Sequence, residues 1–120
     1  MLKHAPDNAR FVGFEANMEQ VYCGCDLLFH PSYSESLGLV ILEASAIGLP
    51  LVVRRLPVYN GWLKEGANCL MGESPQQFAS AISRLLSGQE TSSSSEGIAN
   101  GHSFETAGEA LLEAYKAVLK

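Results

Sequence analysis

Two glutamates, Glu35 and Glu43, are the residues of this sequence whose type and spacing point to chemistry. Glu35 lies in a polar stretch, 30–38, that follows an apolar run, and Glu43 lies in an apolar stretch, 39–47, with helical spacing. If a helix begins near Ser36, the two carboxylates lie about 12 Å apart along its axis. This separation is too long for the carboxylate pair of a retaining glycosidase and does not suit a shared metal ion. It suits two acids that hold different parts of one extended ligand.

The start of that helix is a second feature that favours ligand binding. Backbone N–H groups are free in the first turn of a helix and carry partial positive charge, which attracts an anion. Gly38 has no side chain, so another backbone or a phosphate can approach it closely. We therefore expect a diphosphate at the helix start, between the two acids, with no metal ion needed to hold it.

A purely structural interpretation of these residues stays open. Glu35 can be an exposed first-turn residue that the helix dipole favours. The helix 39–47 is apolar nearly all round, which predicts that it is buried, so an ionised Glu43 needs a hydrogen-bond partner such as a neighbouring backbone group. His30 ends a strand beside this site, either as a ligand contact or with no chemical role. Spacing alone does not decide between these interpretations.

The elements that must position these residues alternate between strand and helix patterns, which is typical of βα units around a mainly parallel sheet. Ligands bind such sheets at the carboxyl ends of the strands, where the polar stretch lies. Asn17 is expected to cap the first helix, and Gly48 and Pro50 to end the second. The last helix is expected to pack against the body after a Ser-rich loop, 88–103. The predicted strands are 10–14, 26–30, 49–53 and 68–71, and the predicted helices are 18–24, 39–47, 75–86 and 104–119.

Composition narrows the class of protein. A chain of 120 residues with 47% hydrophobic and 18% charged residues fits one globular domain, 1–120. Its net charge of -5 and its single adjacent basic pair, Arg54-Arg55, exclude nucleic-acid binding. No apolar run approaches the roughly 20 residues of a membrane span. Cys23, Cys25 and Cys69 are expected to be reduced core thiols, and the protein to be cytoplasmic.

The stretch from His30 to Pro50 reads HPSYSESLGLVILEASAIGLP. It resembles the signature of family-4 retaining glycosyltransferases of the GT-B fold: Pro-Ser, then Glu, seven residues, a second Glu, Ala, and Gly-x-Pro. The flanking segments 11–14, 51–53 and 65–71 resemble the strands and the Gly-x-Asn-Gly stretch of the same family. The resemblance covers roughly residues 10 to 87.

The resemblance implies a Rossmann-like α/β fold with a mainly parallel sheet of about four strands flanked by helices, lacking the first two βα units of a GT-B carboxy-terminal domain. It implies that the chain binds the sugar donor, a nucleotide-diphospho-sugar such as a UDP-sugar, for transfer of a hexose, with no cofactor and no metal. Glu35 would be catalytic, through the sugar hydroxyls, and Glu43 would accept from the ribose hydroxyls. The implied donor-binding residues are Ser34, Glu35, Ser36, Leu37, Gly38, Leu39 and Glu43.

The sequence departs from the family pattern at two places, and the second of them bears on the acceptor. The stretch 36–38 keeps one glycine where the family has more, and the loop 54–59 resembles that of members that glucosylate membrane diacylglycerol. The acceptor is therefore expected to be a membrane glycolipid such as diacylglycerol, or a glycan, with the protein at the cytoplasmic face of the membrane as one alternative. Because the family also uses an amino-terminal domain, the isolated chain is expected to be inactive.

Two non-catalytic modules are the alternatives. A receiver-type signalling module needs an Asp at the carboxyl end of a strand, but Asp26 begins its strand, which ends at His30-Pro31. A donor-binding scaffold without transfer activity stays open. The edge of strand 26–30 is expected to pair either with strand 11–14 or with a second copy of the chain, as a homodimer.

Overall fold

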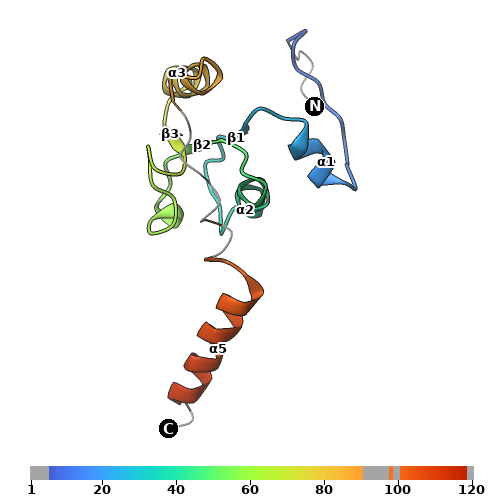
Figure 1. The fold of residues 1–120 in the computed structure, drawn as a ribbon. Helices are drawn as coiled ribbons and strands as arrows, with labels where there is room; N and C mark the ends of the chain where they lie inside the picture. Colours follow the sequence, from blue (N-terminus) through green and yellow to red (C-terminus); the bar gives the residue numbers. More distant parts are fainter. Residues whose placement is uncertain (1–5, 91–97, 99–100, 119–120) are drawn as a thin grey trace.

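A computed structural model describes residues 6–90, 98 and 101–118. Three parallel strands form one sheet in the order β1-β2-β3. The helices α2 and α3 lie on opposite faces of the sheet (Figure 1), so the predicted α/β class with a parallel sheet flanked by helices is confirmed. The elements are α1 (Met18–Cys23), β1 (Leu28–His30), α2 (Leu39–Ala46), β2 (Leu51–Arg54), the 3-10 turn η1 (Pro57–Tyr59), β3 (Leu70–Gly72), α3 (Pro75–Leu86) and α5 (Phe104–Val118).

The central strand β2 organises the core. Its residues Leu51, Val52 and Val53 are fully buried because successive side chains of a strand point to opposite faces of a sheet that is covered on both sides. Leu51 and Val53 pack in the cluster under α2, and Val52 packs in the cluster under α3. The same alternation in β1 directs Phe29 towards α3, where its ring lies 5.1 Å from the ring of Phe78. His30 therefore points to the α2 face, as Leu28 does.

The helix α2 begins later than the spacing of the two glutamates suggests. Gly38 takes a left-handed conformation, with φ 80°, and the helix starts at Leu39. Glu35 consequently lies in the loop before the helix, not in its first turn. The expected burial on all sides is also wrong, because only one face of α2 packs on the sheet: Ile41 and Ala44 are buried, whereas Leu39 is 64% exposed.

Local start and stop signals predicted most other elements. The Asn17 side chain accepts a hydrogen bond from the backbone N–H of Gln20 and caps α1. Ser74 caps α3 in the same way, with Pro75 in its first turn, and α3 has the predicted bounds. The strands expected at 26–30, 49–53 and 68–71 are present, each with a core shorter than or shifted from the predicted range.

The strand predicted over 10–14 does not form. Phe11, Val12 and Phe14 are 70%, 66% and 94% exposed, and the segment pairs with none of the three strands. A short apolar run forms a strand only where a neighbour accepts and donates its backbone hydrogen bonds. Because β1 pairs with β2 on one side and not with 10–14 on the other, the expected pairing of these two segments is also wrong. Pairing of β1 with a second copy stays a prediction.

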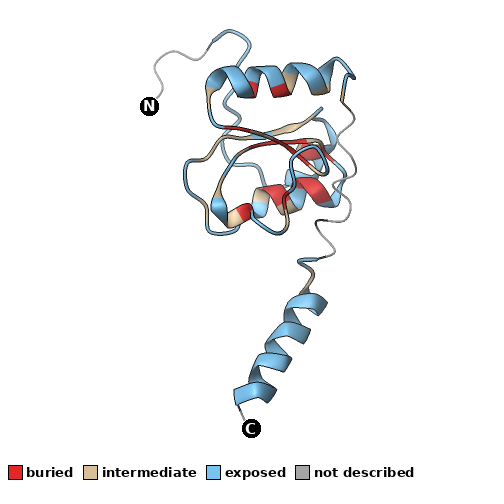
Figure 2. Cartoon of the chain, turned by 90° about the vertical axis from the view of Figure 1, so that its left-hand side faces the viewer, coloured by how far each residue is buried: buried red, intermediate tan, exposed pale blue. Residues whose placement is uncertain are grey.

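The terminal helix α5 has the predicted position but does not dock against the body. It extends away from the sheet and its helices and is exposed along the length that can be described (Figure 2). Its apolar residues Leu111, Leu112 and Tyr115 are 58%, 55% and 60% exposed. The body is instead contacted just before α5, by Ile98, which is 5% exposed and belongs to the core cluster under α2. The predicted loop 88–103 falls largely outside the described residues.

The cysteines occupy two different environments. Cys69 is buried, and burial raises the pKa of its thiol to about 12, so it is a core thiol as predicted. Cys23 and Cys25 are exposed, which corrects the prediction for these two, because α1 buries only Tyr22. All three are free. Among the described residues, no helix is both long and apolar enough to span a membrane.

Candidate functional site

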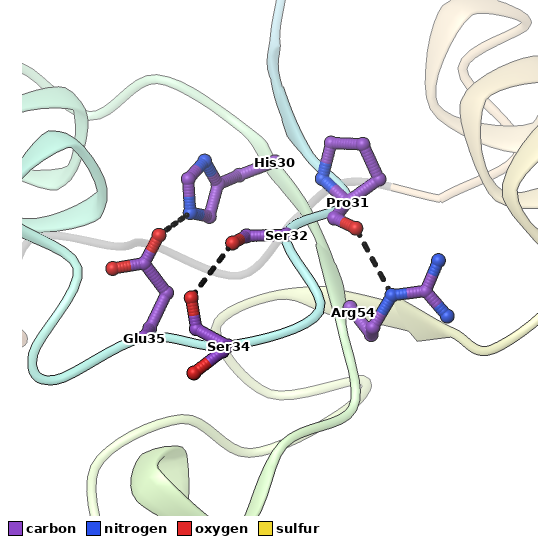
Figure 3. A network of polar contacts seen from close by, with 6 residues as sticks. All are labelled: His30, Pro31, Ser32, Ser34, Glu35 and Arg54. Atoms are coloured by element: carbon purple, nitrogen blue, oxygen red, sulfur yellow. Dashed lines mark hydrogen bonds and ion pairs between the residues drawn. The ribbon is translucent and has the colours of Figure 1, made fainter.

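The loop between β1 and α2 holds Glu35 against the end of β1. His30 is the last residue of β1, and its Nε2 lies 2.8 Å from Oε1 of Glu35 (Figure 3). With the proton on Nε2, the imidazole donates this hydrogen bond to the carboxylate. Both side chains are mostly buried, with 20% and 23% exposed. Ser32 Oγ donates to the backbone carbonyl of Ser34 at 2.9 Å, which closes the loop on itself.

Arg54, at the end of β2, ties this loop to the loop after β3. Its Nε donates to the carbonyl of Pro31 at 3.0 Å, and its Nη1 donates to the carbonyl of Glu73 at 2.9 Å. The guanidinium also lies 3.9 Å above the ring centroid of Tyr33. Through these contacts Arg54 holds the carboxyl ends of the three strands together. Its neighbour Arg55 forms an exposed ion pair with Glu65, which raises the pKa of Arg55.

Gly38 allows the sharp entry into α2. The residue is buried, and a Cβ at this position would lie 3.0 Å from Cδ1 of Ile41 and 3.5 Å from the hydroxyl of Tyr59. No side chain caps α2, and Ile41 donates to the carbonyl of Gly38 at 2.9 Å. The N–H groups of Leu39 and Val40 precede this first intrahelical bond, so they face the open end of the helix. The arrangement suits an anion at the start of α2.

Glu43 has a different partner from the one expected. Its side chain is exposed, and Tyr22 of α1 donates a hydrogen bond from its hydroxyl to Oε2 at 2.8 Å. The carboxylate is therefore neither deeply buried nor bonded to a neighbouring backbone group. Burial of Tyr22, together with this hydrogen bond and the charge of Glu43, raises the pKa of Tyr22 to about 12.

Tyr59 packs close to Gly38. Its side chain is 1% exposed, and its hydroxyl is buried without a hydrogen-bond partner among the described residues. Burial, followed by the charge of Glu35, raises the pKa of Tyr59. The sequence does not predict the place of Tyr59 beside Gly38, because that place depends on the turn η1, which brings the ring to the start of α2.

The structure thus gathers most of the predicted site residues in one loop. The residues 34–38 lie together before α2 and Leu39 begins it, whereas Glu43 lies further along the helix beside α1. The sequence analysis left the role of His30 open and placed neither Tyr22 nor Tyr59 at this site. The helical spacing of Met18 and Tyr22 was a usable signal for the apolar face of α1, of which only Tyr22 is buried. In the part of the chain that can be described, no three or more His, Cys, Asp and Glu side chains group to hold a metal ion.

Comparisons with known proteins place this arrangement in a family. Residues 1–88 match the family of glycosyl transferases group 1. The chain is 34% identical over 123 aligned positions to a processive diacylglycerol alpha-glucosyltransferase of Acholeplasma laidlawii, which covers 99% of this chain and 37% of that protein. It is also 34% identical over 104 positions to a D-inositol 3-phosphate glycosyltransferase of Corynebacterium urealyticum, covering 82% of this chain and 24% of the relative.

A solved structure agrees with these matches. Anabaena HepE in complex with UDP-glucose superposes with a TM-score of 0.70 and 26% sequence identity, over 90% of this chain and 32% of that one. The chain therefore spans between about a quarter and somewhat more than a third of the length of these proteins. These matches leave the receiver-type alternative without support. The chain belongs to the glycosyl transferases group 1 family.

Proposed function

We propose that this chain is the donor-binding part of a retaining glycosyltransferase that holds a nucleotide-diphospho-sugar and transfers its hexose to an acceptor. The observation that carries the proposal is the loop 30–39, which fixes the Glu35 carboxylate beside the uncapped start of α2. The similar HepE structure contains UDP-glucose, which supports a UDP-sugar as the donor.

Each part of the loop has a chemical role in this proposal. The diphosphate accepts hydrogen bonds from the N–H groups at the start of α2, where the helix dipole favours its charge. Ser34 and the backbone of 36–39 surround the sugar and the phosphates. Glu35 accepts from sugar hydroxyls, and these bonds strengthen as positive charge develops on the sugar ring in the transition state. Glu43 accepts from the ribose hydroxyls. No metal ion has a role in these steps.

His30 is a positioning residue in this proposal. Its hydrogen bond to Oε1 leaves Oε2 of Glu35 to meet the sugar. The imidazole also restricts the rotamers of a side chain on a loop, so less entropy is lost when the sugar binds.

The test is calorimetric titration of UDP-glucose and UDP into the complete protein, followed by an assay of glucose transfer. We expect binding of both, weaker binding of both in the double variant Glu35→Ala/Glu43→Ala, and unchanged binding in the control Glu109→Gln on α5. Binding without transfer to any acceptor would support the donor-binding scaffold instead. Absence of binding by the wild type would contradict the proposal. The isolated chain is expected to bind UDP only weakly and to show no transfer.

We further propose a lipid acceptor of the diacylglycerol class, with the protein at a membrane surface. The similarity to the diacylglycerol glucosyltransferase extends over 99% of this chain, whereas the similarity to the inositol phosphate glycosyltransferase covers 82%. Transfer from UDP-glucose to diacylglycerol in phospholipid vesicles, compared with transfer to D-inositol 3-phosphate in solution, tests this choice. Faster transfer to the inositol phosphate would overturn it.

A further inference from the structure

The hydroxyl of Tyr59 is a buried polar group whose position lacks a structural explanation. Its ring packs edge to face against Trp62, with the ring centroids 5.5 Å apart, and the whole side chain is 1% exposed. The ring therefore has packing partners, but the hydroxyl has no hydrogen-bond partner within the described residues. Because an unpaired buried hydroxyl destabilises a fold, phenylalanine would serve better at this position if packing were its only role.

Three features of the proposed donor site meet at this hydroxyl. It would lie 3.5 Å from a Cβ at Gly38, the residue that precedes α2. Burial, followed by the charge of Glu35, raises the pKa of Tyr59, so the hydroxyl is protonated and able to donate. The start of α2 has no side-chain cap that could serve as its partner.

We propose that Tyr59 is a binding residue of the donor site, whose hydroxyl donates a hydrogen bond to a phosphate oxygen of the nucleoside diphosphate at the start of α2. This inference rests on the proposed function. A phosphate oxygen fits because the helix start attracts an anion and because a charged acceptor makes the stronger hydrogen bond. Because the hydroxyl is buried, a phosphate oxygen reaches it only when the loop before α2 shifts on binding, and the new bond then replaces no hydrogen bond among the described residues.

The test compares Tyr59→Phe with the wild type in the complete protein, by titration of UDP and UDP-glucose and by thermal unfolding without ligand. The substitution keeps the ring that packs on Trp62 and removes only the hydroxyl. We expect the Kd of both ligands to rise about tenfold. We also expect the Tm of the unliganded protein to stay equal or to rise, because the variant no longer buries an unpaired group. Tyr115→Phe, on exposed α5, is the matched control and should change neither quantity.

The possible failures are distinguishable. Unchanged Kd values together with a lowered Tm would show that the hydroxyl is structural and would overturn this inference alone. A weaker affinity for UDP-glucose with unchanged affinity for UDP would show that the hydroxyl contacts the sugar, which contradicts the phosphate assignment. If the wild type bound neither ligand, the proposed function would fail, and this inference with it.

Discussion

Glu35 and Glu43 carry the same carboxylate, but the fold places them in different settings. Glu35 lies on a loop, mostly buried, with the imidazole of His30 as its partner. Glu43 lies on a regular helix, exposed, with the phenol of Tyr22 as its partner. A carboxylate fixed at the carboxyl end of the sheet suits a contact that must strengthen during the reaction. A carboxylate on the helix surface suits a contact that holds the ligand equally well before and during the reaction.

The largest expected effect comes from Glu35→Ala. Loss of a contact that strengthens in the transition state should lower kcat on the order of 100-fold, with little change in the Kd of UDP. Steady-state kinetics with UDP-glucose and titration with UDP measure the two quantities. Glu109→Gln is the control for loss of a glutamate charge. A rise in KM with unchanged kcat would place Glu35 in ground-state binding and would remove the contrast with Glu43.

Glu43→Gln should have the next largest effect, and this effect should be on KM and Kd instead of kcat. A weaker acceptor for the ribose hydroxyls should raise the KM and Kd of the UDP-sugar about tenfold while kcat stays within about twofold. The same kinetic and binding measurements apply. Equal losses in kcat for Glu35→Ala and Glu43→Gln would show that the two acids do not divide the work as proposed.

His30→Asn removes the imidazole that is hydrogen-bonded to Glu35, and so tests whether this bond matters for the role of Glu35. If His30 acts by holding Glu35, its replacement should lower kcat about fivefold in the wild type and have no further effect in the Glu35→Ala background. A double-mutant cycle on kcat measures this coupling. Additive losses in the two backgrounds would show that His30 acts independently of Glu35.

The smallest expected effect concerns Tyr22 and appears in stability at alkaline pH. The pKa of Tyr22 is raised from its ordinary value of 10.0 to about 12, so the folded state holds this proton more tightly than the unfolded state. The stabilisation of the folded state by the protonated Tyr22 is fully present below pH 10 and is lost as the pH rises towards 12. The free energy of unfolding should therefore fall less steeply across this range in Tyr22→Phe than in the wild type. Equal slopes in denaturant titrations at several pH values would contradict the assigned hydrogen bond to Glu43.

The sequence predicted elements well where a local signal fixes them. Asn17, Gly48 and Pro75 act on their own neighbours in the chain, so the ends of α1, α2 and α3 follow from short-range rules. The polar loop before α2 was predicted as the site because the carboxyl ends of parallel strands meet at one edge of a sheet. The assignment of its residues to donor binding stays a prediction.

Predictions failed where the outcome depends on a distant partner. The apolar residues of 10–14 and of α5 have the right periods for a strand and a helix, but a period says nothing about what covers the apolar face. The position of Tyr59 under Gly38 depends in the same way on how the turn η1 folds back over α2.

The most direct test of the central claim is a crystal structure of the complete protein with UDP-glucose bound. The proposal places the diphosphate within hydrogen-bond distance of the N–H groups of Leu39 and Val40, the glucose hydroxyls against Glu35, and the ribose hydroxyls against Glu43. A diphosphate bound away from the start of α2, with neither glutamate in contact with the ligand, would contradict it.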